Sequence, residues 1–278
     1  MDVTQETEQA KLWNGPAGRA WVESQELLDR LLKPFEALLV EQVSAAGRLQ
    51  VLDVGCGTGA TTLAVARLLE GKGACTGLDI SEPMTTAAKA RAEREKTPAR
   101  FICANAQAYE FESRFDMIVS RFGVMFFDDP VRAFSNLRRA VTDDGEIRFI
   151  AWRSAAENPF MTTAERAAAS LLPNLPARKP DGPGQFAFGN GQRVHTILEE
   201  SGWKRIDLRP VDVTCTLPEK ELVPYLTHVG PVGLALQEAD DATRARVVDA
   251  LRAAFTPYIY GAEARFETAC WLVGAQAG

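Results

Sequence analysis

Histidine and paired cysteine are scarce in this sequence. Its 278 residues include only two histidines, His195 and His228, and five cysteines, none of them in a C-x-x-C pair. An odd number of widely spaced cysteines does not predict a disulfide framework, and a free thiol in an apolar run behaves as a small hydrophobic side chain. We therefore expect reduced cysteines, as is typical of the cytoplasm, and no metal site.

The sequence also lacks an excess of basic residues and long hydrophobic runs. It carries 31 Lys and Arg against 37 Asp and Glu, which gives a formal net charge of −6. Nucleic-acid binding needs clustered positive charge, and a membrane-spanning helix needs about 18 consecutive apolar residues. The N-terminal sequence MDVTQETEQA is acidic and polar, unlike a signal peptide. We expect a soluble cytoplasmic protein without nucleic-acid partners or membrane insertion.

What the sequence does contain is an alternation of short apolar strands and helices. The segments with strand character are 49–54, 74–80, 100–104, 115–120, 146–152, 203–210 and 265–277. Helical patterns such as 58–70 and 81–95 separate the first of them, and this order predicts βαβ units with right-handed crossovers. We expect an α/β fold with a doubly wound, mostly parallel, seven-stranded Rossmann-like sheet and helical insertions.

The sequence VLDVGCGTGATT passes from a strand into a helix through Gly55, Gly57 and Gly59. Missing side chains let a ligand touch main-chain N–H groups at the helix start, and the carboxylate of Asp53 at the strand end needs a donor. The plainer alternative is a tight turn with no ligand. Gly55, Gly57 and Ala60 also satisfy the G-x-G-x-x-G/A pattern of dinucleotide sites, so the glycines alone do not name the ligand.

A second acidic residue, Asp79, stands at the tip of the second predicted strand, twenty residues beyond Gly59. A carboxylate in this place can accept two hydrogen bonds from a ribose diol. The alternative is a strand-end acid that caps the next helix. Because NAD and S-adenosylmethionine (SAM) both carry a ribose, Asp79 supports a nucleoside ligand without choosing between them.

The pattern D-x-G-x-G-x-G, followed by Asp79, resembles the glycine loop of class I SAM-dependent methyltransferases over about residues 48–153. The segments SRFGVMFFDDPVRAFSNLRRAVTDDGEIRF and WNGPAGRAWVE resemble a bacterial branch related to the ubiquinone/menaquinone-biosynthesis methyltransferases. The resemblance implies SAM as the cofactor and S-adenosylhomocysteine (SAH) as the product. It also implies that Asp53 reaches the methionine ammonium and that Asp79 binds the ribose.

The resemblance assigns further residues to cofactor binding. They are Gly55, Cys56, Gly57 and Gly59 along the methionyl part, Ile80 and Met84 beside the adenine, Asn105, Ala106 and Gln107 after the third strand, Ser120 to Phe122 facing the sulfonium, and Trp13 in a lid. Asn105 stands where the family usually has an acid.

The chain is expected to divide into several parts. These are lid helices in 1–47, a SAM-binding core in 48–153, helical cap segments for the acceptor in 154–190 and 218–262, and the remainder of the core in 191–217 and 263–278. In the lid, Pro34 interrupts an apolar helical pattern over 19–43 after a short leading helix.

The reading favoured by these motifs is methyl transfer from SAM to an oxygen, nitrogen or carbon atom of a small-molecule acceptor. The candidate catalytic residues are His228, as a base, and Arg121, which could bind a carboxylate or phenolate of the acceptor or pair with Asp128 or Asp129. The alternatives are a SAM-binding protein without methyl transfer and a NAD-dependent oxidoreductase. The sequence lacks the [D/N]-P-P-[Y/F] pattern of base-methylating enzymes. It leaves the number of chains open, a homodimer included.

Overall fold

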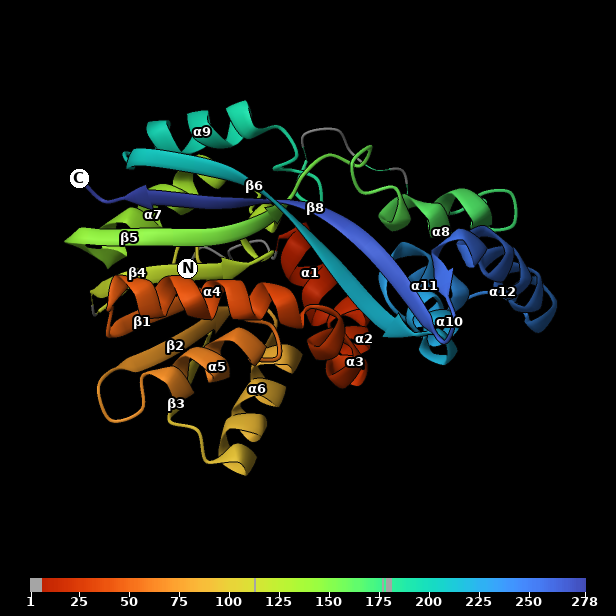
Figure 1. Cartoon of the computed structure of the whole chain (residues 1–278), viewed down its shortest axis with the longest axis horizontal. Helices are drawn as coiled ribbons and strands as arrows, with labels where there is room; N and C mark the ends of the chain where they lie inside the picture. Colours follow the sequence, from red (N-terminus) through yellow and green to blue (C-terminus); the bar gives the residue numbers. More distant parts are fainter. Residues whose placement is uncertain (1–6, 113, 177, 179–181) are drawn as a thin grey trace, which may run out of the picture.

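The computed structural model describes residues 7–112, 114–176, 178 and 182–278. Its centre is one sheet with the strand order β3-β2-β1-β4-β5-β8-β6, and β7 pairs with β8 (Figure 1). The strands are β1 (Gln50–Val54), β2 (Ala74–Asp79), β3 (Ala99–Cys103), β4 (Phe115–Arg121), β5 (Val141–Trp152), β6 (Lys204–Pro218), β7 (Ile259–Tyr260) and β8 (Glu263–Gln276).

The directions of the strands confirm the predicted doubly wound, mostly parallel sheet. Strands β1 to β5 are parallel, and β8 runs antiparallel between β5 and β6. The order reverses between β1 and β4, which is where ligands of such sheets bind. The sheet has eight strands rather than the predicted seven, because Ile259 and Tyr260 pair with Ala264 and Glu263. Two residues are too few to show a strand pattern in a sequence.

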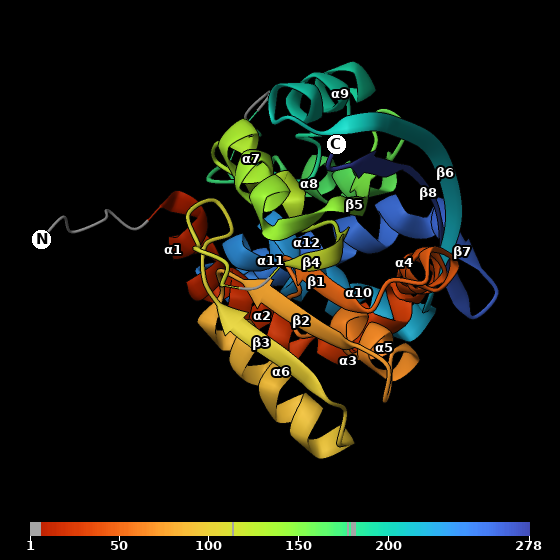
Figure 2. The same cartoon turned by 90° about the vertical axis from the view of Figure 1, so that its left-hand side faces the viewer.

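Helices cover both faces of the sheet. On one face lie α4 (Lys33–Ala46), α5 (Ala60–Leu68) and α6 (Glu82–Glu95), and on the other lie α7 (Pro130–Ala140) and α9 (Gly191–Glu200) (Figures 1 and 2). Neighbouring residues of β1 serve different cores. Val51 packs in a cluster with Val43 of α4 and Val65 of α5, whereas Leu52 packs in the cluster that contains Phe134 of α7. Because successive side chains of a strand point to opposite faces of the sheet, one buried strand packs against the helices of both layers.

From residue 7 onward, three short helices precede α4. They are α1 (Glu8–Asn14), α2 (Pro16–Glu23) and α3 (Gln25–Leu31). The sequence predicted a short leading helix and then one break at Pro34, but the chain also breaks at Ser24, which ends α2 and begins α3. Pro34 stands in the first turn of α4, where a missing N–H leaves no helical bond unmade. Helix α4 packs against α5, β4 and β5 and so belongs to the layer on the sheet.

The remaining helices form a group beside one end of the sheet (Figure 1). They are α8 (Phe160–Ala168), α10 (Glu219–His228), α11 (Gly230–Leu236) and α12 (Asp241–Phe255). The structure also has two 3-10 turns, η1 (Val124–Phe126) after β4 and η2 (Thr256–Tyr258) after α12. Strand β6 continues past the predicted 203–210 and pairs with β8 to its end at Pro218. From Glu263 to Ala269, β8 pairs with β6 but not with β5. This extended hairpin supports the helical group.

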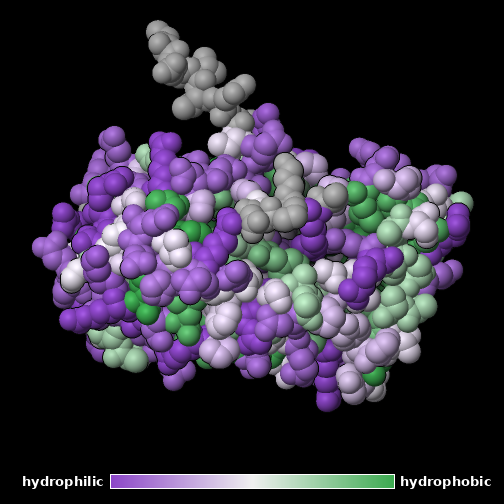
Figure 3. All heavy atoms as spheres, turned by 90° about the horizontal axis from the view of Figure 1, so that it is seen from above, coloured by the Kyte–Doolittle hydropathy of each residue, from purple (hydrophilic) through white to green (hydrophobic). Residues whose placement is uncertain are grey.

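The surface is mostly polar on the face that Figure 3 shows, where hydrophobic residues form separate groups among hydrophilic ones. Within the described ranges, no helix is both long enough and apolar enough to cross a bilayer. Many large apolar side chains are instead buried, among them Trp203, Phe35 and Phe149.

Candidate functional site

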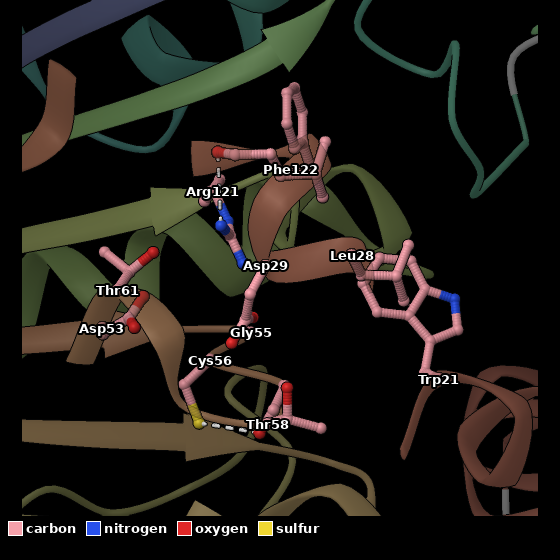
Figure 4. Close-up of a pocket in the computed structure, with 12 residues that line it drawn as sticks. Trp21, Leu28, Asp29, Asp53, Gly55, Cys56, Thr58, Thr61, Arg121 and Phe122 are labelled. Atoms are coloured by element: carbon pink, nitrogen blue, oxygen red, sulfur yellow. Dashed lines mark hydrogen bonds between the residues drawn. The ribbon is translucent and has the colours of Figure 1, made fainter. Parts of the chain in front are cut away.

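A small cavity of about 40 Å³ lies at the switch point of the sheet, where β1 and β4 end side by side (Figure 4). We call it the glycine-turn cavity. It is lined by Trp21, Leu28, Asp29, Leu32, Asp53, Gly55, Cys56, Gly57, Thr58, Thr61, Arg121 and Phe122. Helices α2 and α3 supply its cover, and the loops after β1 and β4 supply its floor. The cavity therefore contains both the predicted glycine turn and the predicted Arg121.

The glycine turn adopts the backbone conformation that its sequence requires. Gly55, Gly57 and Gly59 have φ angles of 69°, 53° and 86°, which side chains disfavour. The turn is held to β2 because the N–H groups of Gly55 and Cys56 donate to the carbonyl of Leu78. Gly59 then begins α5, so the helix N-terminus points its unpaired N–H groups at this region.

Gly123 is a part of the site that the sequence reasoning missed. It follows Phe122 in the loop after β4, and a Cβ added to it would lie 2.6 Å from the Cα of Gly55. A Cβ on Gly55 would in turn lie 2.5 Å from the Cα of Gly123. The two loops therefore touch through bare backbone. The only signal in the sequence was a glycine next to the segment already assigned to the sulfonium.

Asp53 is buried near the end of β1, and only one of its two carboxylate oxygens accepts a hydrogen bond. Its Oδ2 accepts a 2.6 Å hydrogen bond from Thr62, whereas its Oδ1 has no hydrogen-bond partner among the described residues. Burial raises the pKa of Asp53 to about 6, against the lowering effects of the Thr62 hydrogen bond and of Arg121. An orphaned carboxylate oxygen in a cavity is suited to a cationic donor from a ligand.

Arg121 ends β4 and Phe122 follows it, and both line the cavity. The Nη1 of Arg121 donates to the carbonyl of Leu32 at 3.5 Å. Asp129 instead caps α7, and the described structure records no ion pair between Arg121 and either Asp128 or Asp129. Phe122 has a φ of 65°, unusual for a bulky residue, and its ring stacks on Trp152 at 4.2 Å. The stack holds the strained backbone in place.

Asp79 holds the glycine turn in this structure. Its Oδ2 accepts from the N–H of Gly57 at 2.8 Å, and its Oδ1 accepts from the N–H of Ser81 at 2.9 Å. Burial raises its pKa, and the hydrogen bonds from Ser81 and Gly57 oppose that shift. Each oxygen keeps a further lone pair, so the structure leaves room for the predicted ribose contact but also gives Asp79 a structural role.

We expect Asp79→Ala to weaken SAH binding by about 1–3 kcal/mol, the range for hydrogen bonds to a charged group. Isothermal titration calorimetry with SAH measures it. The matched control is Asp116→Ala, because Asp116 likewise accepts from two main-chain N–H groups, those of Leu49 and Gln50, but at the opposite end of β1. The control should lose stability and keep its SAH affinity. An Asp79→Ala protein with unchanged affinity would contradict the ribose role.

The other predicted adenosine-binding residues lie outside the lining of the cavity. Met84 and Ala106 are buried. The Oδ1 of Asn105 accepts from the main chain of Gln107, and the Oε1 of Gln107 accepts from Asp129. Ile80 directly follows β2, and its carbonyl accepts a hydrogen bond from the lid residue Asn14.

Helix α1 covers the region of β2 where these residues gather. The side chain of Asn14 also accepts from the N–H of Glu82, and the hydroxyl of Ser81 donates to the carbonyl of Trp13 at 2.7 Å. The ring of Trp13 packs edge-on against Trp21 and Phe126. Trp21 lines the glycine-turn cavity, whereas the predicted lid residue Trp13 is not among the lining residues.

Two predicted site residues are placed away from the glycine-turn cavity. Ser120 is fully buried, and its hydroxyl donates to the carbonyl of Val54 at 2.7 Å. His228 is exposed on α10, and its Nε2 lies 2.6 Å from the Oε2 of Glu23. It lines a second groove of about 620 Å³ between α10 and the α2–α3 junction, on the other side of α3. The structure does not bring His228 together with Arg121.

The residues present fit the amino-acid end of SAM. The orphaned Oδ1 of Asp53 suits an ammonium group, and the bare backbone of the turn allows close approach. Arg121 adds a positive charge beside the same cavity. At the adenosine end, α1 contacts the β2–α6 loop through hydrogen bonds of Trp13 and Asn14.

Part of the chain is similar to known methyltransferases. A family model described as a methyltransferase domain matches residues 51–145. An uncharacterized protein of Mycobacterium tuberculosis is 28% identical over 174 residues, which cover 62% of this chain and 60% of that protein. The ubiquinone biosynthesis O-methyltransferase of Coxiella burnetii is 30% identical over 142 residues, 50% of this chain and 56% of that enzyme. Each match thus spans less than two thirds of the relative.

Among solved structures, the cyclase SpnF superposes with a TM-score of 0.56 at 16% identity, over 93% of this chain and 94% of that chain. At this identity the likeness concerns the fold. The glycine turn, the acid at the end of β2 and the matched segment agree with the resemblance that the sequence showed. Residues 51–145 thus match a methyltransferase domain, and over this segment the chain is similar to the class I SAM-dependent methyltransferases, whose cofactor is S-adenosylmethionine.

Proposed function

We propose that the protein transfers the methyl group of SAM to a small-molecule acceptor and releases SAH. The observation that carries this proposal is the buried, unpartnered oxygen of Asp53 beside the bare backbone of Gly55 and Gly57. A carboxylate in that state costs free energy unless a ligand supplies a charged donor. The amino-acid end of SAM supplies one. A nicotinamide dinucleotide places a pyrophosphate at such a turn, which an acid would repel.

The contribution of the chain to the reaction is placement and exclusion of water. When bound, SAM supplies an already activated methyl group, so the protein needs to hold the acceptor in line with it. The apolar residues Leu28, Leu32 and Phe122 form the wall of the cavity next to Arg121. Because Leu28 lies in α3 and Leu32 caps the end of that helix, the lid that covers the cofactor also excludes water from the place where the methyl group is transferred.

The base role of His228 stays a prediction, since its ring is paired with Glu23 on the far side of α3. The net charge of −6 supports a small-molecule acceptor over nucleic acid. We keep the cytoplasmic location and the open number of chains as proposals of the same kind.

Two measurements test the proposed function. Calorimetry with SAH should show saturable binding that excess NAD does not displace, and incubation with SAM and candidate acceptors should produce SAH. No binding of SAH to the folded protein would overturn the proposal. Binding without turnover would favour the second candidate, a SAM-binding protein without methyl transfer. The fold allows that candidate, because it is shared with a protein named as a cyclase.

A further inference from the structure

The groove between α10 and the α2–α3 junction, which we call the lid groove, is large enough to hold a small molecule. Its volume is about 620 Å³, against about 40 Å³ for the glycine-turn cavity, and small-molecule sites typically measure about 300–1,000 Å³. The two hollows lie on opposite sides of α3, since Leu28 and Asp29 line the cavity whereas Glu26 and Arg30 line the groove. The lid groove is therefore separate from the predicted cofactor site.

Two ion pairs cross the lid groove and hold its walls at a fixed separation. The Nε2 of His228 lies 2.6 Å from the Oε2 of Glu23, and Arg30 is paired with Glu221. Within each wall the two paired residues stand about two helical turns apart. The pairs thus join the walls at two places, and Tyr225 of α10 stands between them in the sequence and lines the groove.

The middle of the lid groove offers an apolar surface with a polar edge. Leu27 comes from α3, and Pro224 and Tyr225 come from α10. The ring of Tyr225 packs against the main core on its other side, and burial raises its pKa to about 12, so its hydroxyl stays neutral. Within the described ranges that hydroxyl has no hydrogen-bond partner. An aromatic or aliphatic body fits this surface.

The charges of the lid groove favour a cation. Three carboxylates, those of Glu23, Glu26 and Glu221, face one guanidinium and one imidazole. Arg30 and His228 are already paired, whereas Glu26 is exposed and has neither an ion pair nor a hydrogen bond to any residue that the structure describes. A carboxylate or phosphate ligand would meet this excess of negative charge, but an ammonium group would find a free acceptor.

We propose that the lid groove binds an organic ammonium ion with an apolar or aromatic body. The body lies on Tyr225 and Leu27, and the ammonium group donates to the carboxylate of Glu26. A cation beside the face of a tyrosine ring gains further attraction. The site goes beyond the proposed function, because it needs no SAM. Since it shares only α2 and α3 with the glycine-turn cavity, the cation and the cofactor can be bound together.

The test uses three probes that share a phenylethyl body and differ in charge. Calorimetry on the full chain at neutral pH compares 2-phenylethylamine, a cation, with neutral 2-phenylethanol and anionic 3-phenylpropionate. We expect the amine to saturate the protein and to bind about threefold or more tightly than the alcohol, and the anion to bind more weakly still. Added salt should weaken the binding of the amine and leave that of the alcohol unchanged.

A pair of matched variants assigns the site. In Glu26→Gln the dissociation constant of 2-phenylethylamine should rise about three- to fivefold, and that of 2-phenylethanol should stay within about 1.5-fold. The control Glu93→Gln removes the same charge from an exposed position of α6, outside the lid groove, and should change neither. Equal weakening of the amine in both variants would mean attraction to the net charge of the protein and would overturn the site.

Titration in the presence of saturating SAH separates the two hollows. The amine should bind with SAH still in place, because α3 lies between the two sites. Displacement of SAH by the amine would put the amine in the glycine-turn cavity and refute the lid groove as its site. No saturable binding of the amine up to about 10 mM would also refute it. A protein that binds the amine but not SAH keeps the lid groove and loses the proposed function.

Discussion

In Asp53→Asn, SAH should bind about 100-fold more weakly than in the wild-type protein, the equivalent of roughly 3 kcal/mol. The asparagine can still accept from Thr62 through its one oxygen, so the contact that orders this side chain survives. Its amide nitrogen then occupies the place of the orphaned Oδ1. A donor would face the ammonium donor of the ligand, and the negative charge would be gone.

The same substitution should stabilise the ligand-free protein at neutral pH. Burial raises the pKa of Asp53 from 3.8 to about 6, so the folded state holds this proton more tightly than the unfolded chain does. Stability from this group is complete below the unfolded pKa and is lost as pH rises from about 4 to about 6. At pH 8 Asp53→Asn should therefore unfold with a free energy about 3 kcal/mol higher than wild type. Below about pH 4 the difference should vanish.

Ligand binding has the opposite dependence on pH. The ammonium group needs an ionised Asp53, so the SAH affinity of wild type should fall by about tenfold per pH unit as pH drops below about 6. Urea unfolding and calorimetry at several pH values measure both effects. The control is Glu146→Gln, because Glu146 is also a buried acid but lies within hydrogen-bond distance of Arg48 and Arg148. It should destabilise the protein and leave SAH binding unchanged, and an Asp53→Asn protein that behaves like it would refute the ligand role.

The parts of the site that the sequence predicted are local in the chain. Asp53 and the glycines lie within seven residues, and the physical reasons for them, positive φ angles and a strand-end charge, act within that turn. The sheet was predictable for the same reason, since buried strands and amphipathic helices show their periods directly. The two-residue β7 and the break at Ser24 have no such period.

The parts that were missed depend on which segments meet. Leu28, Asp29 and Leu32 line the cavity because α3 folds over the turn, and no spacing in the sequence indicates that contact. Ser120 and Arg121 were assigned together, but neighbours in a strand point to opposite sides. Ser120 accordingly bonds to β1, whereas Arg121 reaches the cavity. Gly123 matters only through its contact with Gly55.

That contact gives the other large expected effect. Gly123→Ala should destabilise the protein by about 3 kcal/mol or more, because overpacking against backbone cannot be relieved by turning a side chain. The added Cβ would lie 2.6 Å from the Cα of Gly55 and 2.7 Å from the carbonyl oxygen of Val54. Gly123 itself has an ordinary φ of −75°, so backbone strain would add nothing. The glycine turn would have to move, and SAH affinity should fall with it.

Gly71→Ala separates crowding from backbone preference. Gly71 has a φ of 72°, which disfavours alanine, but a Cβ there would meet nothing within 4 Å. It should cost only about 1–2 kcal/mol and leave SAH binding intact. Urea unfolding should therefore find Gly123→Ala less stable than Gly71→Ala, although only Gly71 has a φ angle that disfavours alanine. If Gly71→Ala proves the more damaging, or if Gly123→Ala keeps full SAH affinity, the close contact between the loops after β1 and β4 does not shape the cofactor site.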